Sequence, residues 1–136
     1  MSNKLVTFLL TRMMNVYVLS LGVLSLGWGL ILCLPFGGPT TGRVAEFMTY
    51  LAPEPVWGVF SMLAGLLMTH GAIRSNPCTS KLGLFLGFLV WAFVFLTNVI
   101  GLPLGTGVMS SAFIAWCHVM GYLVIGSRPI VLKNRL

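Results

Sequence analysis

The stretch KLGLFLGFLVWAFVFLTNVIGL, Lys81 to Leu102, decides the fold class of this chain. After Lys81 it carries no charged residue, and nearly all of its side chains are apolar. It has the length of about 20 residues that a helix needs to cross ~30 Å of hydrocarbon. Its apolar residues follow one another without the alternation of a barrel strand, so the stretch predicts a membrane-spanning helix.

Three further runs share these properties, and the seven prolines lie only in connections or at run ends, where a missing N–H does no harm. We therefore expect an all-α integral membrane protein in which four transmembrane helices form an antiparallel bundle. The chain forms one membrane domain over residues 1–136, with spans at about 13–36, 56–73, 82–102 and 108–126.

The composition agrees with lipid as the solvent of the chain. Hydrophobic residues make up 57% and charged residues 7%, whereas a soluble domain has about a quarter of its residues charged. The net charge of +6 does not indicate nucleic acid, because the basic residues are scattered between apolar runs without aromatic residues that could stack on bases. The first run is too long for a signal peptide, and LPFGGPTTGR after it offers no cleavage site, so we expect a retained span.

The basic residues predict the orientation of the chain in the membrane. Lys and Arg in short loops favour the cytoplasmic side. One side receives seven of the eight: Lys4, Arg12, Arg74, Lys81, Arg128, Lys133 and Arg135. The other side receives Arg43 alone. The sequence therefore predicts a multi-pass protein of the cell inner (cytoplasmic) membrane with both termini in the cytoplasm.

The first outer loop holds the only two acidic residues, Glu46 and Glu54. Its apolar residues recur at helical spacing, which predicts a short amphipathic helix at about 42–52 on the outer membrane surface. Arg43 and Glu46 lie away from the apolar stripe, Glu54 favours the positive end of the second span, and Trp57 suits headgroup depth. A paired-carboxylate site is less favoured, because a proline-rich break separates the two glutamates. On the inner side, the segment between Lys4 and Arg12 predicts a weaker interfacial element.

Small residues on each span predict faces where two helix backbones come close. The first two spans show the same spacing in GVLSLGWGL and GVFSMLAGL, a faint repeat for which chance similarity is the simpler account. These faces suit a bundle within one chain. They also suit a homo-oligomer or contact with another membrane partner, and the two uses can occur together. The predicted packing residues are Gly22, Ser25 and Gly29; Gly58, Ser61 and Gly65; Gly83 and Gly87; and Gly107, Ser111 and Ala115.

Polar residues within the spans are the candidates for function, because they are expensive in hydrocarbon. His118 continues the face of Ser111 and Ala115, so we expect it to point into the bundle. It either hydrogen-bonds a hydroxyl, a carbonyl or Asn98, or it acts as a proton relay or ligand. His70 lies about 7 Å from the depth of His118 at 1.5 Å per residue, so the two do not predict a haem.

No other chemistry is indicated by the sequence. The three cysteines lack zinc spacing, and the chain has no nucleophilic triad, phosphate loop or dinucleotide fingerprint. We expect neither a cofactor nor a metal, and no enzymatic activity.

Two short patterns resemble those of uncharacterised small membrane proteins encoded by tailed bacteriophages. One is the Pro-Glu-x-x-Trp-Gly start of a span, matched by Pro53, Glu54, Trp57 and Gly58. The other is Gly-x-x-x-Gly-x-x-x-Trp in the next span, matched by Gly83, Gly87 and Trp91. The resemblance covers about the last two-thirds of the chain and implies a phage or host inner-membrane setting.

Two functions of different class follow from these observations. The first is a holin-like or membrane-remodelling protein that self-associates through its glycine faces. The second is a structural or accessory subunit of a larger membrane or virion-associated assembly, with the outer amphipathic helix as a docking surface.

Overall fold

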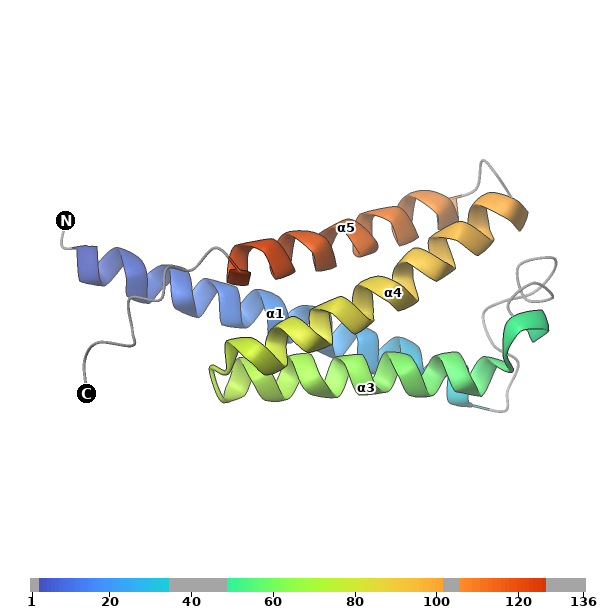
Figure 1. Ribbon diagram of the computed structural model, residues 1–136, viewed down its shortest axis with the longest axis horizontal. Helices are drawn as coiled ribbons and strands as arrows, with labels where there is room; N and C mark the ends of the chain where they lie inside the picture. The colour runs from blue at the N-terminus through green and yellow to red at the C-terminus, as the bar shows by residue number, and fades with distance from the viewer. Residues whose placement is uncertain (1–2, 35–48, 102–105, 127–136) are drawn as a thin grey trace.

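The computed structural model describes residues 3–34, 49–101 and 106–126. Within these ranges the chain is helical, with no strand, and its long helices are α1 (Asn3–Cys33), α3 (Glu54–Ile73), α4 (Pro77–Gly101) and α5 (Thr106–Gly126) (Figure 1). All four are long and apolar enough to cross a membrane. The prediction of an all-α chain with four helices of spanning length is therefore confirmed.

The helix boundaries differ from the predicted spans, because a helix ends at its caps and not where hydropathy falls. α1 begins at Asn3 instead of residue 13, so the expected interfacial element is its first part. It ends at Cys33 instead of residue 36, because Pro35 disfavours a helical conformation at Leu34. α3 and α4 begin two and five residues earlier than predicted, α4 ends one residue earlier, and α5 begins two residues earlier.

The predicted outer amphipathic helix at 42–52 lies mainly outside the described residues. Only a helical turn at 49–51 belongs to both, and Tyr50 and Leu51 in it are exposed. Arg43 and Glu46 also lie outside the described ranges.

The turn between α3 and α4 is built from Arg74, Ser75 and Asn76. Two backbone bonds close the end of α3, from Asn76 N–H to Gly71 O (2.8 Å) and from Ser75 N–H to Ala72 O (3.3 Å). This is a Schellman motif, and Ser75 takes the left-handed conformation that the motif requires, with φ 51°. The Asn76 side chain then caps α4 by accepting the N–H of Cys78 at 3.0 Å, and Pro77 holds the first helical position.

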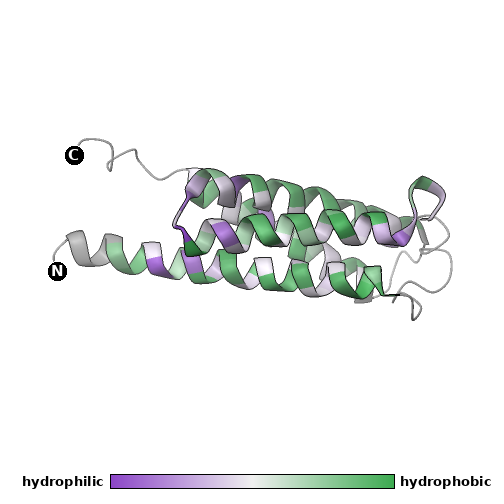
Figure 2. Cartoon of the chain, turned by 90° about the horizontal axis from the view of Figure 1, so that it is seen from below, coloured by the Kyte–Doolittle hydropathy of each residue, from purple (hydrophilic) through white to green (hydrophobic). Residues whose placement is uncertain are grey.

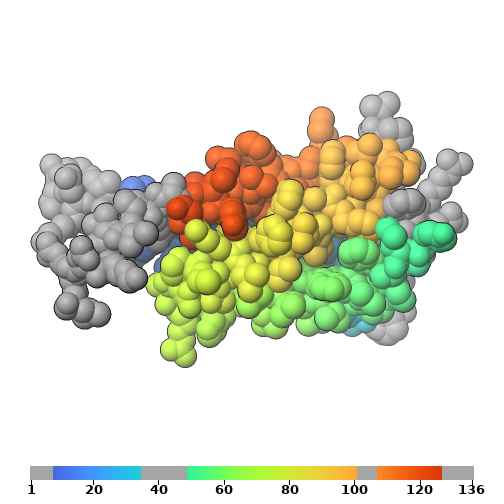
Figure 3. Space-filling model, viewed as in Figure 1, coloured from blue at the N-terminus to red at the C-terminus, as the bar shows by residue number. Residues whose placement is uncertain are grey.

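The helices pack mainly on their neighbours in the sequence. α1 packs on α3, α3 on α4, and α4 on α5, while α1 touches α4 and α5 only lightly. On the face seen in Figure 3, α4 fills the space between α3 and α5. The Tyr17 hydroxyl donates to the Cys117 carbonyl at 2.7 Å and links α1 with α5.

The start of α1, the α3–α4 turn and the end of α5 lie toward the same end of the molecule (Figure 1). Hydrophilic residues gather toward this end, while the middle of the helices is mostly hydrophobic (Figure 2). We call it the basic end, after Arg12, Arg74 and Lys81.

Two groups of buried side chains form the interior. The one nearer the basic end consists of Val18, Leu21, Ala64, Met68, Ala72, Leu84 and Ile125. The other is aromatic: Trp91, Val94 and Ala115 are buried there, with Trp28, Trp57, Phe88, Phe93 and Ile114 packed against them.

Candidate functional site

The glycines of α1 and α3 bring the backbones of these two helices into close contact. A Cβ placed on Gly29 would lie 2.6 Å from the carbonyl oxygen of Gly58 and 2.8 Å from the amide nitrogen of Met62. A Cβ on Gly65 would lie 2.7 Å from the oxygen of Gly22. Real Cβ atoms do not approach backbone atoms this closely, so only glycine permits the two helices to pack at this distance.

The contacts of α1 and α3 are related by a local two-fold symmetry. Residues 36 apart in the sequence take equivalent places: the Cβ position of Gly22 faces Thr69 Oγ1 at 2.6 Å, and that of Gly58 faces Cys33 Sγ at 2.6 Å. The faint repeat noted in the sequence thus coincides with a symmetric packing face. Because the glycines have the same spacing on both helices, Gly22 packs against Gly65 and Gly29 packs against Gly58.

Ser25 and Ser61 lie at the centre of this face. Both are buried, and the Ser61 hydroxyl donates to the Ser25 carbonyl at 2.8 Å. The Ser25 hydroxyl has no partner among the described residues, so the symmetry does not extend to the hydrogen bonds. The predicted packing residues of the first two spans therefore face each other within one chain.

Other helices of the same chain fill the space beside the glycines of α4. A Cβ on Gly83 would lie 2.7 Å from the amide nitrogen of Met68 on α3. A Cβ on Gly87 would meet the imidazole of His118 on α5, at 2.5 Å from Nε2. The Gly-x-x-x-Gly pattern of the third span therefore serves two different neighbours.

On α5, the predicted packing residues also face inward. Ser111 and Ala115 are buried, and the Cβ position of Gly107 lies 3.0 Å from Asn98 Oδ1. The Ser111 hydroxyl donates to the carbonyl of Gly107 at 2.7 Å, in its own helix.

His118 is fully buried, with 0% of its surface exposed. Its Nδ1 lies 2.8 Å from the carbonyl oxygen of Ile114, one turn earlier in α5. Because a carbonyl can only accept, Nδ1 carries the proton in the neutral ring, and Nε2 is left as an acceptor. Nε2 faces Gly87 and has no hydrogen-bond partner within the described part of the chain.

A hydroxyl, a carbonyl and Asn98 were the predicted partners of His118. The structure gives the ring a carbonyl partner, Ile114, which belongs to the same helix. Asn98 donates to the carbonyl of Val94 at 2.8 Å and lies against Gly107. Gly107 precedes His118 by roughly 16 Å along the helix at 1.5 Å per residue. Asn98 is therefore not the partner of His118. The ring lies against Gly87 and donates to the carbonyl of Ile114.

Of the interfacial residues within the described ranges, Glu54 lies in the first turn of α3, as its predicted role at a helix start requires. Trp57 is half-buried: its ring stacks on Phe93 with centroids 4.1 Å apart, and its Nε1 donates to the carbonyl of Ala52 at 3.2 Å. Trp57 thus joins α3 to α4 as well as lying near a span end.

Sequence reasoning missed several polar groups of the interior. Trp28 packs on Trp91 with centroids 5.4 Å apart. Both indole N–H groups are buried without a partner in the described ranges, as is the Thr69 hydroxyl. The repeat spacing could have pointed to Thr69, because it occupies the place of Cys33 in the second copy. No sequence signal paired Trp28 with Trp91.

The chemistry of this interior is that of close packing. Among the described residues no group of three His, Cys, Asp or Glu side chains could hold a metal ion. No protein-family model matches the chain, and no match is found among curated proteins or solved structures.

Proposed function

We propose that the chain is a small, non-enzymatic, polytopic protein of a bacterial inner membrane, where its four long helices cross the bilayer as an antiparallel bundle with both termini in the cytoplasm. Four apolar helices of spanning length support the insertion. The reverse-order pairing of Gly22 with Gly65 and Gly29 with Gly58 supports the antiparallel packing. The gathering of Arg12, Arg74 and Lys81 at the basic end supports its cytoplasmic placement.

Cys78, which is exposed in the first turn of α4, is a natural probe of this placement. In a Cys33→Ala, Cys117→Ala background, we expect a membrane-impermeant maleimide to label Cys78 only after spheroplasts are permeabilised. Arg43→Cys in a background without the native cysteines is the control, and it should label in intact spheroplasts. Labelling of Cys78 before permeabilisation would contradict the orientation.

Within that membrane, we propose that the protein acts as a structural or accessory subunit of a larger membrane or virion-associated assembly. One observation carries this choice: the glycine faces expected to drive self-association are filled by helices of the same chain. A bundle whose close-packing faces are used internally presents larger apolar side chains to its surroundings. The phage setting that the resemblance implies belongs to this proposal.

A holin-like role is the second candidate, and Gly27 favours it. A Cβ placed on Gly27 would have no atom of another helix of the described chain within 4 Å, so this side of α1 leaves room for a second copy of the chain. Self-association through α1 would give the protein a route to membrane remodelling that leaves the internal glycine contacts intact.

Induced expression separates the two candidates. For an accessory subunit, we expect unchanged membrane potential and growth, together with co-purification of a stoichiometric partner when the native host or phage genome is present. Collapse of the potential at a set time, abolished by Gly27→Leu, would instead establish the holin-like role. Gly27 is the proper position for this test, since Gly83→Leu or Gly87→Leu would disturb the bundle itself.

A further inference from the structure

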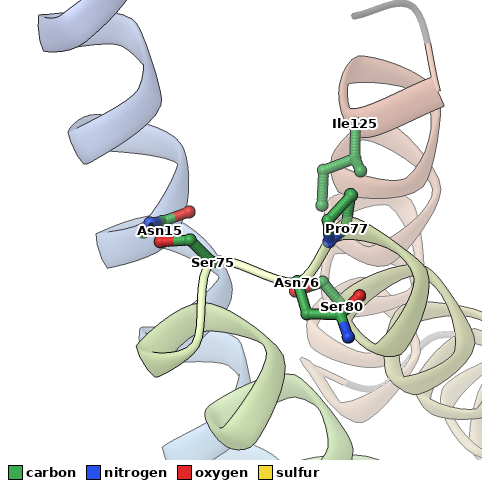
Figure 4. Close-up of a pocket in the computed structure, with 6 residues that line it drawn as sticks. All are labelled: Asn15, Ser75, Asn76, Pro77, Ser80 and Ile125. Atoms are coloured by element: carbon green, nitrogen blue, oxygen red, sulfur yellow. Dashed lines mark hydrogen bonds between the residues drawn. The ribbon is translucent and has the colours of Figure 1, made fainter. Parts of the chain in front are cut away.

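A small cavity opens at the basic end, between α1, the α3–α4 turn and the last turn of α5. Its volume is about 20 Å³, enough for one water-sized group. Figure 4 shows Asn15 of α1 beside Ser75 of the turn, and Ile125 of α5 on the far side near Pro77. The lining residues are Asn15, Ser75, Asn76, Pro77, Ser80 and Ile125.

The polar groups of this cavity offer hydrogen-bond donors. Asn15 Nδ2 donates to Ser75 Oγ at 3.0 Å, so the hydroxyl proton of Ser75 and the second amide proton of Asn15 remain to donate to a guest. Ser80, only 5% exposed, adds a second hydroxyl and so a third donor. The carboxamide oxygen of Asn76 is already used by the start of α4, so in the described lining the Asn15 oxygen is the carboxamide acceptor left beside three donors. The donors outnumber it, which suits a guest that accepts, such as an anionic oxygen.

Cations lie next to the lining residues on α1, on the α3–α4 turn and on α4. Arg74 adjoins Ser75, and Arg12 lies one turn before Asn15 on α1. Lys81 follows Ser80, and its Nζ lies 5.9 Å from the ring centre of Tyr122 on α5. The only acidic residue in the described ranges, Glu54, belongs to the start of α3 and so to the other end of the molecule. The charged side chains near this cavity in the described ranges are therefore all positive.

We propose that this cavity binds the phosphate group of an anionic phospholipid in the inner leaflet. One phosphate oxygen enters the cavity and accepts from Ser75 and Asn15, while the three cations neutralise the lipid's charge from the rim. The proposal rests on the membrane placement proposed above, which puts the basic end at headgroup depth.

The size of the cavity favours a lipid over free phosphate as the ligand. A space for one oxygen holds little of a free ion, so most of the binding must come from outside the cavity. Exposed apolar side chains flank it on three helices: Met13 and Val16 on α1, Ile73 at the end of α3, and Leu82 on α4. They are placed to contact the acyl chains of a lipid whose headgroup is held above them.

Native mass spectrometry of the detergent-solubilised full chain tests the proposal, with phosphatidylglycerol and phosphatidylcholine of equal acyl chains as probes. We expect phosphatidylglycerol to bind about tenfold more tightly, because both lipids carry the phosphate but the choline cation of phosphatidylcholine is repelled by the cations near the cavity. Asn15→Leu and Ser75→Gly should weaken the binding of both lipids about tenfold, because each removes a hydrogen bond to the phosphate that the two lipids share. Ser75→Gly is the sharper variant, because glycine suits φ 51° and only the hydroxyl is lost.

Arg43→Gln removes the same charge from the other predicted loop and should leave the preference intact, whereas Arg74→Gln should weaken it. Equal binding of both lipids, or unchanged binding of phosphatidylglycerol in Ser75→Gly, would overturn the site. Displacement of the lipid by millimolar inorganic phosphate would overturn the choice of a lipid. Flotation with phosphatidylcholine vesicles tests the membrane placement separately, since a protein that floats but shows no lipid preference refutes the cavity proposal alone.

Discussion

Gly29→Leu is expected to unfold the α1–α3 pair. The new Cβ would lie 2.6 Å from a backbone oxygen and 2.8 Å from a backbone nitrogen of α3, and a helix backbone cannot yield locally. The two helices must separate, which also breaks the symmetric contact at Gly22 and Gly65. We expect the free energy of unfolding to fall by about 3 kcal/mol or more, at the upper end of the effect of overpacking.

Gly27→Leu is the matched control, two residues earlier on the same helix. A Cβ there meets no atom of another helix within 4 Å in the described ranges, and leucine is the better helix former by up to about 1 kcal/mol. This variant should be as stable as the wild type or slightly more so. Equal loss of stability in both variants would mean that leucine disturbs α1 in general and not its packing on α3.

The measurement is a titration of the detergent-solubilised protein with SDS, followed by tryptophan fluorescence, because separation of the helices breaks the contact between Trp28 and Trp91. The reaction of Cys33 with maleimide gives a second reading. Its sulfur lies 2.6 Å from the Cβ position of Gly58, so opening the α1–α3 face should speed the reaction in Gly29→Leu but not in Gly27→Leu.

The number and kind of the long helices could be predicted from the sequence because hydrocarbon imposes one simple demand, a continuous apolar run of sufficient length. The helix ends could not be found from hydropathy, which measures only the part of a helix that lipid can cover. α4 begins at Pro77 because Asn76 caps it, five residues before the apolar run. α1 extends back through Arg12, whose guanidinium lies 4.9 Å from the ring centre of Phe8, because a charge does not by itself end a helix.

The candidate site was predictable in its residues but not in its pairings. A small residue in a span indicates that another helix backbone comes close, but it does not indicate which helix. Gly83 and Gly87 belong to one Gly-x-x-x-Gly pattern, yet α3 packs against Gly83 and the ring of His118 packs against Gly87. For the same reason, the sequence alone did not distinguish packing of helices within one chain from packing between chains.

Gly87→Ala and His118→Ala are expected to compensate each other. A methyl group on Gly87 would lie 2.5 Å from Nε2 of His118, so the ring must rotate and give up its bond to the carbonyl of Ile114. We expect Gly87→Ala alone to lower the free energy of unfolding by about 2 kcal/mol, from overpacking and a lost hydrogen bond. His118→Ala alone should lower it by about 2–4 kcal/mol, because it leaves a cavity in the interior.

In the double variant the new methyl group occupies space that the ring has left, and no buried Nε2 remains without a partner. The combined loss should therefore be smaller than the sum of the single losses by about 1–2 kcal/mol, within the range of coupling found for residues in contact. Gly58→Ala combined with His118→Ala is the control and should be additive, because Gly58 packs on Cys33 and Gly29. If Gly87→Ala and His118→Ala were additive as well, the contact between Gly87 and the ring of His118 would be refuted. If His118 serves packing alone, the double variant should also keep whatever activity the wild type has, whereas a proton relay or ligand site would stay inactive however well the helices repack.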